Sequence, residues 1–334
     1  MNLKDRIEAI AKLGLYIEKS FINENLELLN KVESTNAWFT KENVKKAIAI
    51  WGNQLKLDTI NSWLNPYSLA SEIPKKEVLI IMAGNIPLVG LHDFISVIIC
   101  GHKAAIKKSS ADCILIDVLI DKLFKIDKRF KSYVEFVDNV KDMSFDAVIA
   151  TGSNNSARHF DYYFKDSKRI IRRNRRSIAV LDGNESQDDL KGLSEDIFSY
   201  FGLGCRNVSK LFLPKGYDLD KLFNVFFDFS DIINHRKYAN NYEYNKAVFL
   251  LGGNKIVENG FVMLKEEKSL FSPVAMIYYE YYSSIDKVNS FIDKNNDHIQ
   301  CVVSSEKTPF GEAQNPNLWD YADGVDTVRF LKSL

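Results

Sequence analysis

Short apolar runs alternate with helical patterns along most of this chain, and this alternation constrains the fold more than any other feature. Residues 77–82 (EVLIIM) form a nearly continuous apolar run, which is typical of a buried parallel strand. Helical spacing of apolar residues fills most of the chain before residue 65 and most of the intervals between runs. The pattern predicts an α/β fold with two doubly wound parallel sheets. The expected strands are 77–82, 103–107, 133–137, 147–150, 177–181, 210–213, 247–251 and 274–279.

Length and charge narrow the classes of protein to which the chain can belong. Its 334 residues, 46% of them hydrophobic, suffice for two domains, and two α/β units in tandem are expected to meet near residue 176. Lys+Arg and Asp+Glu both count 44, so no general attraction to nucleic acid or to an anionic membrane is expected. The longest apolar stretch, residues 94–100, falls far short of the ~18 residues of a membrane span, and no signal peptide is visible. We therefore expect a cytoplasmic protein.

The four cysteines are widely spaced and include one in an unusual setting. They form no metal-ligand pair, so no metal site is expected. In the segment FGLGCRNVSKLFL (201–213), Cys205 stands between a glycine-rich turn and an expected strand. Gly202 and Gly204 leave room for a substrate carbonyl to approach the sulfur, and the adjacent Arg206 would favour the thiolate. The alternative is a small buried cysteine at the end of a helix, and local context leaves both interpretations open.

Polar residues follow three of the expected strands of the first half. Asn85 follows the first strand, Lys107 ends the second, and Thr151, Gly152 and Ser153 follow the fourth. In open α/β sheets, ligands bind at the carboxyl ends of the strands. An amide there could donate to an oxyanion, a lysine could reach a cofactor, and a helix start could bind a phosphate. Each residue also has an ordinary interpretation, as a turn-forming Asn, a solvated strand end or a helix N-cap.

The segment KRIIRRNRR (168–176) holds six basic residues in nine. One interpretation is phosphate recognition by Arg172 and Arg173, for the 2′-phosphate of NADPH or the phosphates of CoA. The other is a solvated surface or inter-domain segment. The chain contains no GxGxxG, GxxxxGK[ST], GxSxG or HExxH motif, and His92, His102 and His159 are expected to be structural.

Taken in order, these segments resemble the aldehyde-dehydrogenase superfamily. The chain is more closely similar to the acyl-CoA reductases related to LuxC, over about residues 75–334. The segment LFSPVAMIYY carries Ser272 where the superfamily has Gly. The segments that carry the resemblance are AGNIP (83–87), IKKSSAD (106–112), TGS (151–153), IAVLDGNESQDDL followed by FGLGC (178–205), LFSPVAMIYY (270–279) and PFG (309–311).

The resemblance implies an aldehyde-dehydrogenase-like fold with a cofactor-binding domain and a catalytic thiol domain. Residues 1–176 would form a helical N-terminus and the NAD(P)-binding domain, 177–308 the thiol domain, and 309–334 a segment returning to the cofactor domain. Cys205 would carry the acyl group, and Asn85 with the Cys205 N–H would hold the oxyanion. Lys107, or Lys108 in a shifted register, and Ser153 would contact NADPH or NADH. Acyl-CoA is the implied substrate, an acyl-protein synthetase a candidate partner, and a homo-oligomer a candidate assembly.

Two departures from the superfamily pattern bear on the reaction. The glutamate that activates water in hydrolytic members is missing, because its place falls in residues 171–176 (IRRNRR). This absence favours reduction of an acyl thioester over oxidation of an aldehyde to a free acid. The ribose-binding glutamate is replaced by Ser269, which leaves the pose of the cofactor open.

Three alternatives remain at the level of the sequence. The chain could reduce a short acyl-CoA, or an acyl phosphate such as a γ-glutamyl phosphate. It could instead be a non-catalytic partner of an acyl-protein synthetase, a reading that the two lost glutamates permit. A nucleic-acid-binding module is disfavoured by the balanced charge.

Overall fold

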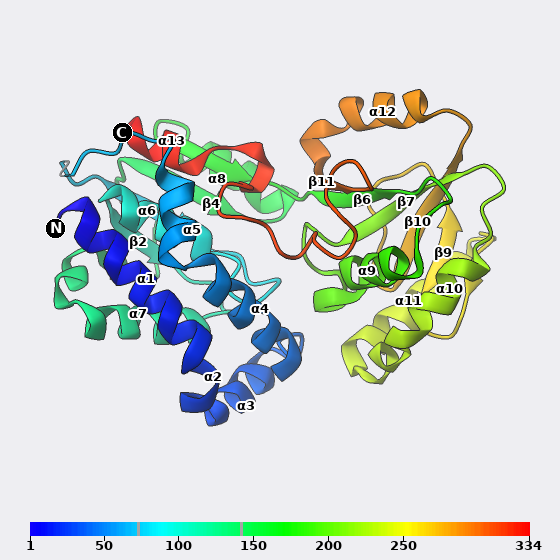
Figure 1. Cartoon of the computed structure of the whole chain (residues 1–334), viewed down its shortest axis with the longest axis horizontal. Helices are drawn as coiled ribbons and strands as arrows, with labels where there is room; N and C mark the ends of the chain where they lie inside the picture. The colour runs from blue at the N-terminus through cyan, green and yellow to red at the C-terminus, as the bar shows by residue number, and fades with distance from the viewer. Residues whose placement is uncertain (72–73, 141–142) are drawn as a thin grey trace. The chain divides into compact units, whose positions relative to one another are not determined.

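The computed structural model describes residues 1–71, 74–140 and 143–334 as two α/β units (Figure 1). The first unit comprises Met1–Asn174 and Asn317–Leu334, and the second comprises Arg175–Pro316. The division therefore follows Asn174, whereas we expected it after residue 176. The C-terminal segment is shared between the units, because 309–316 belong to the second and 317–334 to the first.

Five parallel strands form the sheet of the first unit, in the order β3-β2-β1-β4-β5. Four of them coincide, within one or two residues, with strands expected from the sequence. The fifth, β5, lies inside the basic segment and was not expected. The bounds are β1 (Glu77–Ile81), β2 (Lys103–Lys107), β3 (Val134–Phe136), β4 (Ala147–Thr151) and β5 (Lys168–Arg172).

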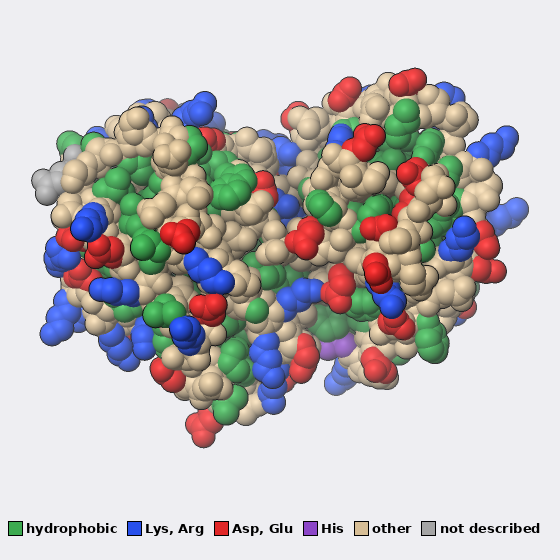
Figure 2. Space-filling view, in the orientation of Figure 1, with side chains coloured by type: hydrophobic (Ala, Val, Ile, Leu, Met, Phe, Trp, Pro, Cys, Tyr) green, Lys and Arg blue, Asp and Glu red, His purple; other side chains and the backbone are tan. Residues whose placement is uncertain are grey.

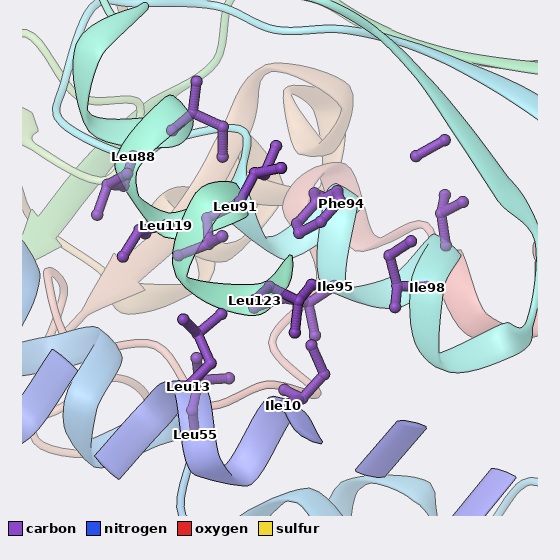
Figure 3. Close-up of a cluster of buried hydrophobic side chains, with 14 of the residues drawn as sticks. Ile10, Leu13, Leu55, Leu88, Leu91, Phe94, Ile95, Ile98, Leu119 and Leu123 are labelled. Atoms are coloured by element: carbon purple, nitrogen blue, oxygen red, sulfur yellow. The ribbon is translucent and has the colours of Figure 1, made fainter. Parts of the chain in front are cut away.

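The central strand β1 is apolar throughout because helices cover both faces of its sheet. Val78 and Ile80 belong to one buried cluster, while Leu79 and Ile81 belong to another on the opposite face. The first cluster is built largely on α1, α6 and α7, whose side chains interlock in Figure 3. The helices of this unit are α1 (Leu3–Lys19), α2 (Phe21–Glu24), α3 (Leu26–Thr35), α4 (Lys41–Gln54), α5 (Leu57–Leu64), α6 (Leu91–Cys100), α7 (Ile114–Ile126), α8 (Asn154–Tyr163) and α13 (Thr327–Lys332).

The second unit holds a six-stranded sheet in the order β11-β6-β7-β10-β9-β8. Its pairs are parallel, except for β8 with β9. Residues of α9 and α10 pack on one face of this sheet, and residues of α12 pack on the other. The bounds are β6 (Arg176–Val180), β7 (Val208–Pro214), β8 (Val257–Glu258), β9 (Met263–Glu266), β10 (Met276–Tyr282), β11 (Ile299–Val303), α9 (Gln187–Phe198), α10 (Asp220–Phe226), α11 (Arg236–Leu251) and α12 (Ile285–Lys294).

The strand expected at residues 247–251 is wrong. These residues form the last turn of helix α11, which starts at Arg236. Leu250 and Leu251 are exposed, so the run does not fill a core. A short apolar run cannot by itself distinguish a strand from a helix, and here the helix continues through residues with good helix propensity.

The C-terminal segment is fixed to the first unit by buried polar contacts. The Nε2 atoms of His92 and His102 lie 2.8 Å and 3.0 Å from the backbone oxygens of Leu318 and Leu331. Burial lowers the pKa of His102, which fits a neutral, structural imidazole. Both histidines therefore have the structural role that we expected.

A buried ion pair joins β5 to α6 and α13. The Arg172 guanidinium donates to the Asp93 carboxylate at 2.6 Å and to the Thr327 hydroxyl at 3.0 Å. Both charged side chains are at most 6% exposed. The neighbouring Arg173 is 55% exposed and pairs with Asp161 at 2.6 Å.

No described helix combines the length and the apolar character needed to cross a membrane. On the face shown in Figure 2, the Lys and Arg side chains are interspersed with Asp and Glu. The balanced composition is thus also visible as a mixed distribution of charge on this face.

Replacing Arg172 should destabilise the first unit strongly. Arg172→Gln leaves the Asp93 carboxylate buried without its partner, and such losses cost about 3–5 kcal/mol. Arg173→Gln is the matched control, because loss of an exposed pair costs about 0–1 kcal/mol. All four tryptophans, at 38, 51, 63 and 319, lie in the first unit, so denaturant unfolding followed by tryptophan fluorescence reports on this unit. Equal midpoints for the two variants would contradict the prediction.

Candidate active site

Three candidate segments of the first unit leave its sheet at the same edge. Ile81, at the end of β1, is level with Lys107 of β2 and with Ala150 of β4. The strands are parallel, so the segments that follow them all start from the carboxyl edge of the sheet, where open α/β sheets bind ligands. Exposed Asn85 lies in the segment after β1. The structure thus brings Asn85, Lys107 and residues 151–153 to one edge.

A buried carboxyl group ties the Asn85 loop to the turn after β2. The Asp112 side chain accepts the Leu88 N–H at 2.6 Å, where Leu88 has a φ of 59°. A Cβ on Gly84 would lie 2.4 Å from the Ser109 hydroxyl, so only glycine allows the two loops to pack this closely. Burial raises the pKa of Asp112 to about 7, although the Leu88 N–H acts in the opposite direction. The KSSAD segment therefore shapes the loop that carries Asn85.

The two lysines at the end of β2 have different surroundings. Lys107 is partly buried, and its Nζ donates to the Asp138 backbone oxygen at 2.5 Å. Lys108 donates to both carboxylate oxygens of Asp117 at 2.7 Å and lies 4.5 Å from the centre of the Phe136 ring. Lys108 is therefore committed to an ion pair. Lys107 remains the better candidate for contact with a cofactor, because its partner is neutral.

Residues 151–153 connect β4 directly to helix α8. Ser153 is the N-cap of this helix, and its Oγ accepts the Ser156 N–H at 3.2 Å. A Cβ on Gly152 would come within 2.9 Å of the Ser156 side chain. Ser153 is exposed, so the start of this ten-residue helix faces solvent at the carboxyl edge. The segment is thus an ordinary N-cap in a position that also suits an anion.

The structure argues against Arg172 as a ligand for a phosphate. Its guanidinium is buried and already serves Asp93 and Thr327, so a phosphate could reach it only if that pair were broken. Sequence reasoning missed this because the basic segment contains a strand, in which alternate side chains point to opposite faces. Arg173 remains the exposed member of the pair.

Cys205, in the second unit, follows a turn with an unusual backbone. Tyr200, Phe201 and Gly202 have φ values of 52°, 59° and 73°. Non-glycine residues in this left-handed region cost about 1–3 kcal/mol each, and they cluster at functional sites. Cys205 is partly exposed and lies just before β7. The glycine-rich turn predicted from the sequence is therefore real, and its strained part begins at Tyr200.

One buried amide holds this turn in place. The Oδ1 of Asn207 accepts the Gly204 N–H at 2.7 Å. Its Nδ2 donates to the backbone oxygens of Asp196, Ile197 and Ser199, at 3.0, 3.3 and 2.8 Å. Asn207 thus connects the end of α9 to the residue before Cys205. Sequence reasoning did not identify it, and the only available signal was an Asn in the turn ahead of a strand.

Ser177 fixes the carbonyl of Cys205 itself. Its fully buried Oγ donates to the Cys205 backbone oxygen at 3.1 Å and accepts the Cys301 N–H at 3.2 Å. The Cys301 thiol lies 3.0 Å from the same Oγ. One hydroxyl therefore links the turn to strands β6 and β11.

The surroundings of the cysteines separate Cys205 from two others. Burial raises the pKa of Cys100 to about 12 and also raises the pKa of Cys301. Both thiols therefore stay protonated near neutral pH. Cys205 is partly exposed beside Arg176, whose Nη1 donates to the backbone oxygens of Gly202 and Gly204 at 3.3 and 3.4 Å.

A small, mostly apolar pocket lies beside this turn, within the second unit. Arg176 and Gly202 form the part of its wall that belongs to the nucleophile region. The remaining wall comes mainly from α9, α11 and the segment that leads into β10, and includes Phe198, Tyr238, Val262, Pro273 and Met276. An apolar wall next to the sulfur suits the hydrocarbon part of an acyl group.

The model of the acyl-CoA reductase (LuxC) family matches residues 11–221, which is more than half of the chain. The chain belongs to this family. The matched residues include Asn85, the first-unit edge and the turn with Cys205. The family identifies the chain as an oxidoreductase of the aldehyde-dehydrogenase type, as the sequence motifs implied.

Solved structures similar to this reductase are aldehyde dehydrogenases. Aldehyde dehydrogenase C from Pseudomonas syringae, in complex with NAD+ and octanal, has 10% identity, covers 87% of this chain and 70% of its own, and gives a TM-score of 0.65. Aldehyde dehydrogenase 21 from Physcomitrella patens, with succinate, has 14% identity, 89% and 71% coverage, and a TM-score of 0.64. The Mycobacterium tuberculosis aldehyde dehydrogenase with NAD+ has 13% identity, 87% and 71% coverage, and a TM-score of 0.62.

At these identities the likeness concerns the fold, and it confirms the predicted aldehyde-dehydrogenase-like α/β architecture. No curated protein sequence matches the chain. Among the described residues, no group of three or more His, Cys, Asp or Glu side chains is arranged to hold a metal ion.

Replacing Asn207 should loosen the second unit around the nucleophile. Asn207→Ala leaves one N–H and three carbonyl oxygens without this partner, and each unsatisfied buried group costs about 1–3 kcal/mol. We expect a loss of at least about 3 kcal/mol in the stability of the second unit. Hydrogen exchange of peptides from residues 175–316, followed by mass spectrometry, measures it. Asn295→Ala, which removes a single donation to Phe291, is the control and should change exchange little. Unchanged exchange in Asn207→Ala would contradict the role given to this amide.

Proposed function

We propose that the chain reduces an acyl-CoA thioester, with a fatty acyl group as the favoured substrate, to the aldehyde through an acyl group carried on Cys205. The observation that carries the proposal is the nucleophile turn. A partly exposed cysteine sits there in a strained backbone that Asn207, Ser177 and Arg176 hold by hydrogen bonds. Membership of the acyl-CoA reductase family supports acyl-CoA over an acyl phosphate as the donor.

In the first half-reaction, the Cys205 thiolate attacks the carbonyl carbon of the thioester. A new bond forms between Cys205 Sγ and this carbon, the bond to the CoA sulfur breaks, and CoA leaves as a thiolate. The charge that develops on the carbonyl oxygen would be stabilised by the Asn85 amide and by the Cys205 backbone N–H. Loss of one such donor typically costs about 10²–10³ in rate.

The first-unit edge fits a dinucleotide cofactor. Ser153 and Gly152 open helix α8 toward solvent at the carboxyl edge, and Lys107 ends the neighbouring strand with a neutral partner. Helix starts of this kind suit phosphate oxygens, and a lysine suits a ribose or a phosphate. Bound NADPH or NADH would supply the hydride that turns the enzyme thioester into a thiohemiacetal, which then releases aldehyde and regenerates Cys205. Arg173, rather than buried Arg172, is the candidate for an added phosphate.

The lack of a general base explains why the acyl group would not be lost to water. The segment in which hydrolytic relatives carry their glutamate begins here in β5, with Arg172 paired to Asp93 and Arg173 paired to Asp161. Residues 171–176 contain no carboxylate. Without a base to activate water, the thioester persists until a hydride or a thiol arrives. An acyl-protein synthetase is a further candidate source of acyl groups.

The proposal predicts a stable acyl-enzyme that only a reduced cofactor converts to aldehyde. Incubation with acyl-CoAs of increasing chain length, without cofactor, should add one acyl mass to the wild type and to Cys113→Ala, and none to Cys205→Ala. Peptide mapping should place the adduct on Cys205. Addition of NADPH or NADH should remove the adduct and yield aldehyde.

Two results of this experiment would contradict the proposal. One is the same adduct in Cys205→Ala. The other is release of free acid at a rate that does not depend on the reduced cofactor. A Cys205 that takes up no acyl group from any of the acyl-CoAs would support the non-catalytic alternative.

A further inference from the structure

Arg176, the first residue of β6, contacts the turn that carries Cys205. Its Nη1 donates to the backbone oxygens of Gly202 and Gly204, at 3.3 Å and 3.4 Å. These carbonyls lie on either side of Leu203, immediately before the nucleophile. Arg176 also forms part of the wall of the apolar pocket beside the turn. One guanidinium therefore contacts both the backbone of the turn and the space next to it.

The charge of Arg176 has no carboxylate to balance it. In the part of the chain that the structure describes, its hydrogen bonds go to neutral carbonyls, and no Asp or Glu lies within ion-pair distance. Arg172, in contrast, is buried against Asp93 at 2.6 Å. A guanidinium withdrawn from water without a counter-charge is unfavourable, so such an arrangement calls for an anion.

The nearby acid is the thiol of the nucleophile. Burial lowers the pKa of Arg176, and the ionised form of Cys205 acts in the opposite direction. The interaction is mutual, since a thiolate that favours the charged guanidinium is itself favoured by it. The arrangement thus supplies a positive charge where the thiolate must exist.

We propose that Arg176 is a positioning residue that supplies the counter-charge for the Cys205 thiolate and fixes the carbonyls of its turn. This inference rests on the proposed function only in taking Cys205 as the nucleophile. Arg176 keeps its proton throughout the reaction. Its charge favours the thiolate before the bond to the acyl carbon forms, and again when the thiohemiacetal collapses and the sulfur recovers its electron pair.

The other charged or titratable groups around the turn do not take this role. Asp196, on α9, accepts the backbone N–H groups of Gly311 and Ala313. Cys301, on β11, has a raised pKa and interacts with Ser177, while Arg206 lowers the pKa of Cys301. His235 caps α11 and packs on the Phe201 ring at 4.2 Å.

The neighbouring Arg175 provides a matched control. It also donates from Nη1 to two backbone oxygens, those of Asn296 and Ile299, each at 3.1 Å. The two arginines differ in which backbone they hold, because only Arg176 contacts the turn before Cys205. Removing either charge changes the net charge of the chain by the same amount.

The test is the rate at which iodoacetamide alkylates Cys205, measured by peptide mapping from pH 5 to pH 10. In Arg176→Gln, the alkylation rate at pH 7 should fall about tenfold or more, and the midpoint of the rate profile should move up by about one pH unit or more. Arg176→Lys keeps the charge and should recover most of the rate. Arg175→Gln should match the wild type. Thermal melting of each variant shows whether it is folded.

The inference fails if Arg176→Gln has the wild-type profile, or if Arg175→Gln slows alkylation as much as Arg176→Gln does. Should Arg176→Gln not fold, an Arg176→Lys profile with the wild-type midpoint supports the inference, and a midpoint raised as far as that of a free thiol overturns it. Reduction of acyl-CoA is assayed in the same samples. No reduction by the wild type counts against the proposed function, while the alkylation profiles still decide the role of Arg176.

Discussion

The hydrogen bonds of the Asn207 side chain are the interaction on which the candidate site depends. The turn before Cys205 contains two non-glycine residues in the left-handed region, which cost about 1–3 kcal/mol each. Four hydrogen bonds from one buried amide, each worth about 1 kcal/mol, offset a cost of this size. Ser177 and Arg176 add contacts to the backbone of the same turn. The sulfur is thereby presented on a rigid backbone at the start of β7, and a fixed nucleophile loses little entropy when it reacts.

The first unit applies the same principle at its own sheet edge. The Asn85 loop contains Leu88 with a positive φ, and the buried Asp112 side chain holds the N–H of that residue. Gly84 lets this loop pack directly on the turn that contains Asp112. In both units, therefore, a buried polar side chain accepts a backbone N–H and fixes the loop that carries a candidate catalytic group. Preorganised donors of this kind need no reorganisation when charge develops on a substrate.

The sequence predicted what local chemistry decides. Strands β1, β2 and β4 are apolar runs with helices on both faces, and the turns after them follow from their small residues. The position of Cys205 followed from its glycine-rich turn and from the order of motifs. What it could not predict depends on distant partners. Strand β5 was hidden by its charged residues, and Arg172 became a structural residue because Asp93 and Thr327 fold onto it. Residues 247–251 turned out helical because a short apolar run has no distinctive period. Asn207 and Ser177 were missed since their roles exist only once α9, β6 and β11 are assembled.

The central claim is that an acyl group on Cys205 is discharged by hydride. It is tested most directly by following the hydrogen itself, with acyl-CoA and a nicotinamide cofactor that carries deuterium at both C4 positions. The account predicts an aldehyde with a single deuterium on its carbonyl carbon, formed by the wild type and not by Cys205→Ala. An aldehyde without deuterium, or a free acid as the main product, would contradict it.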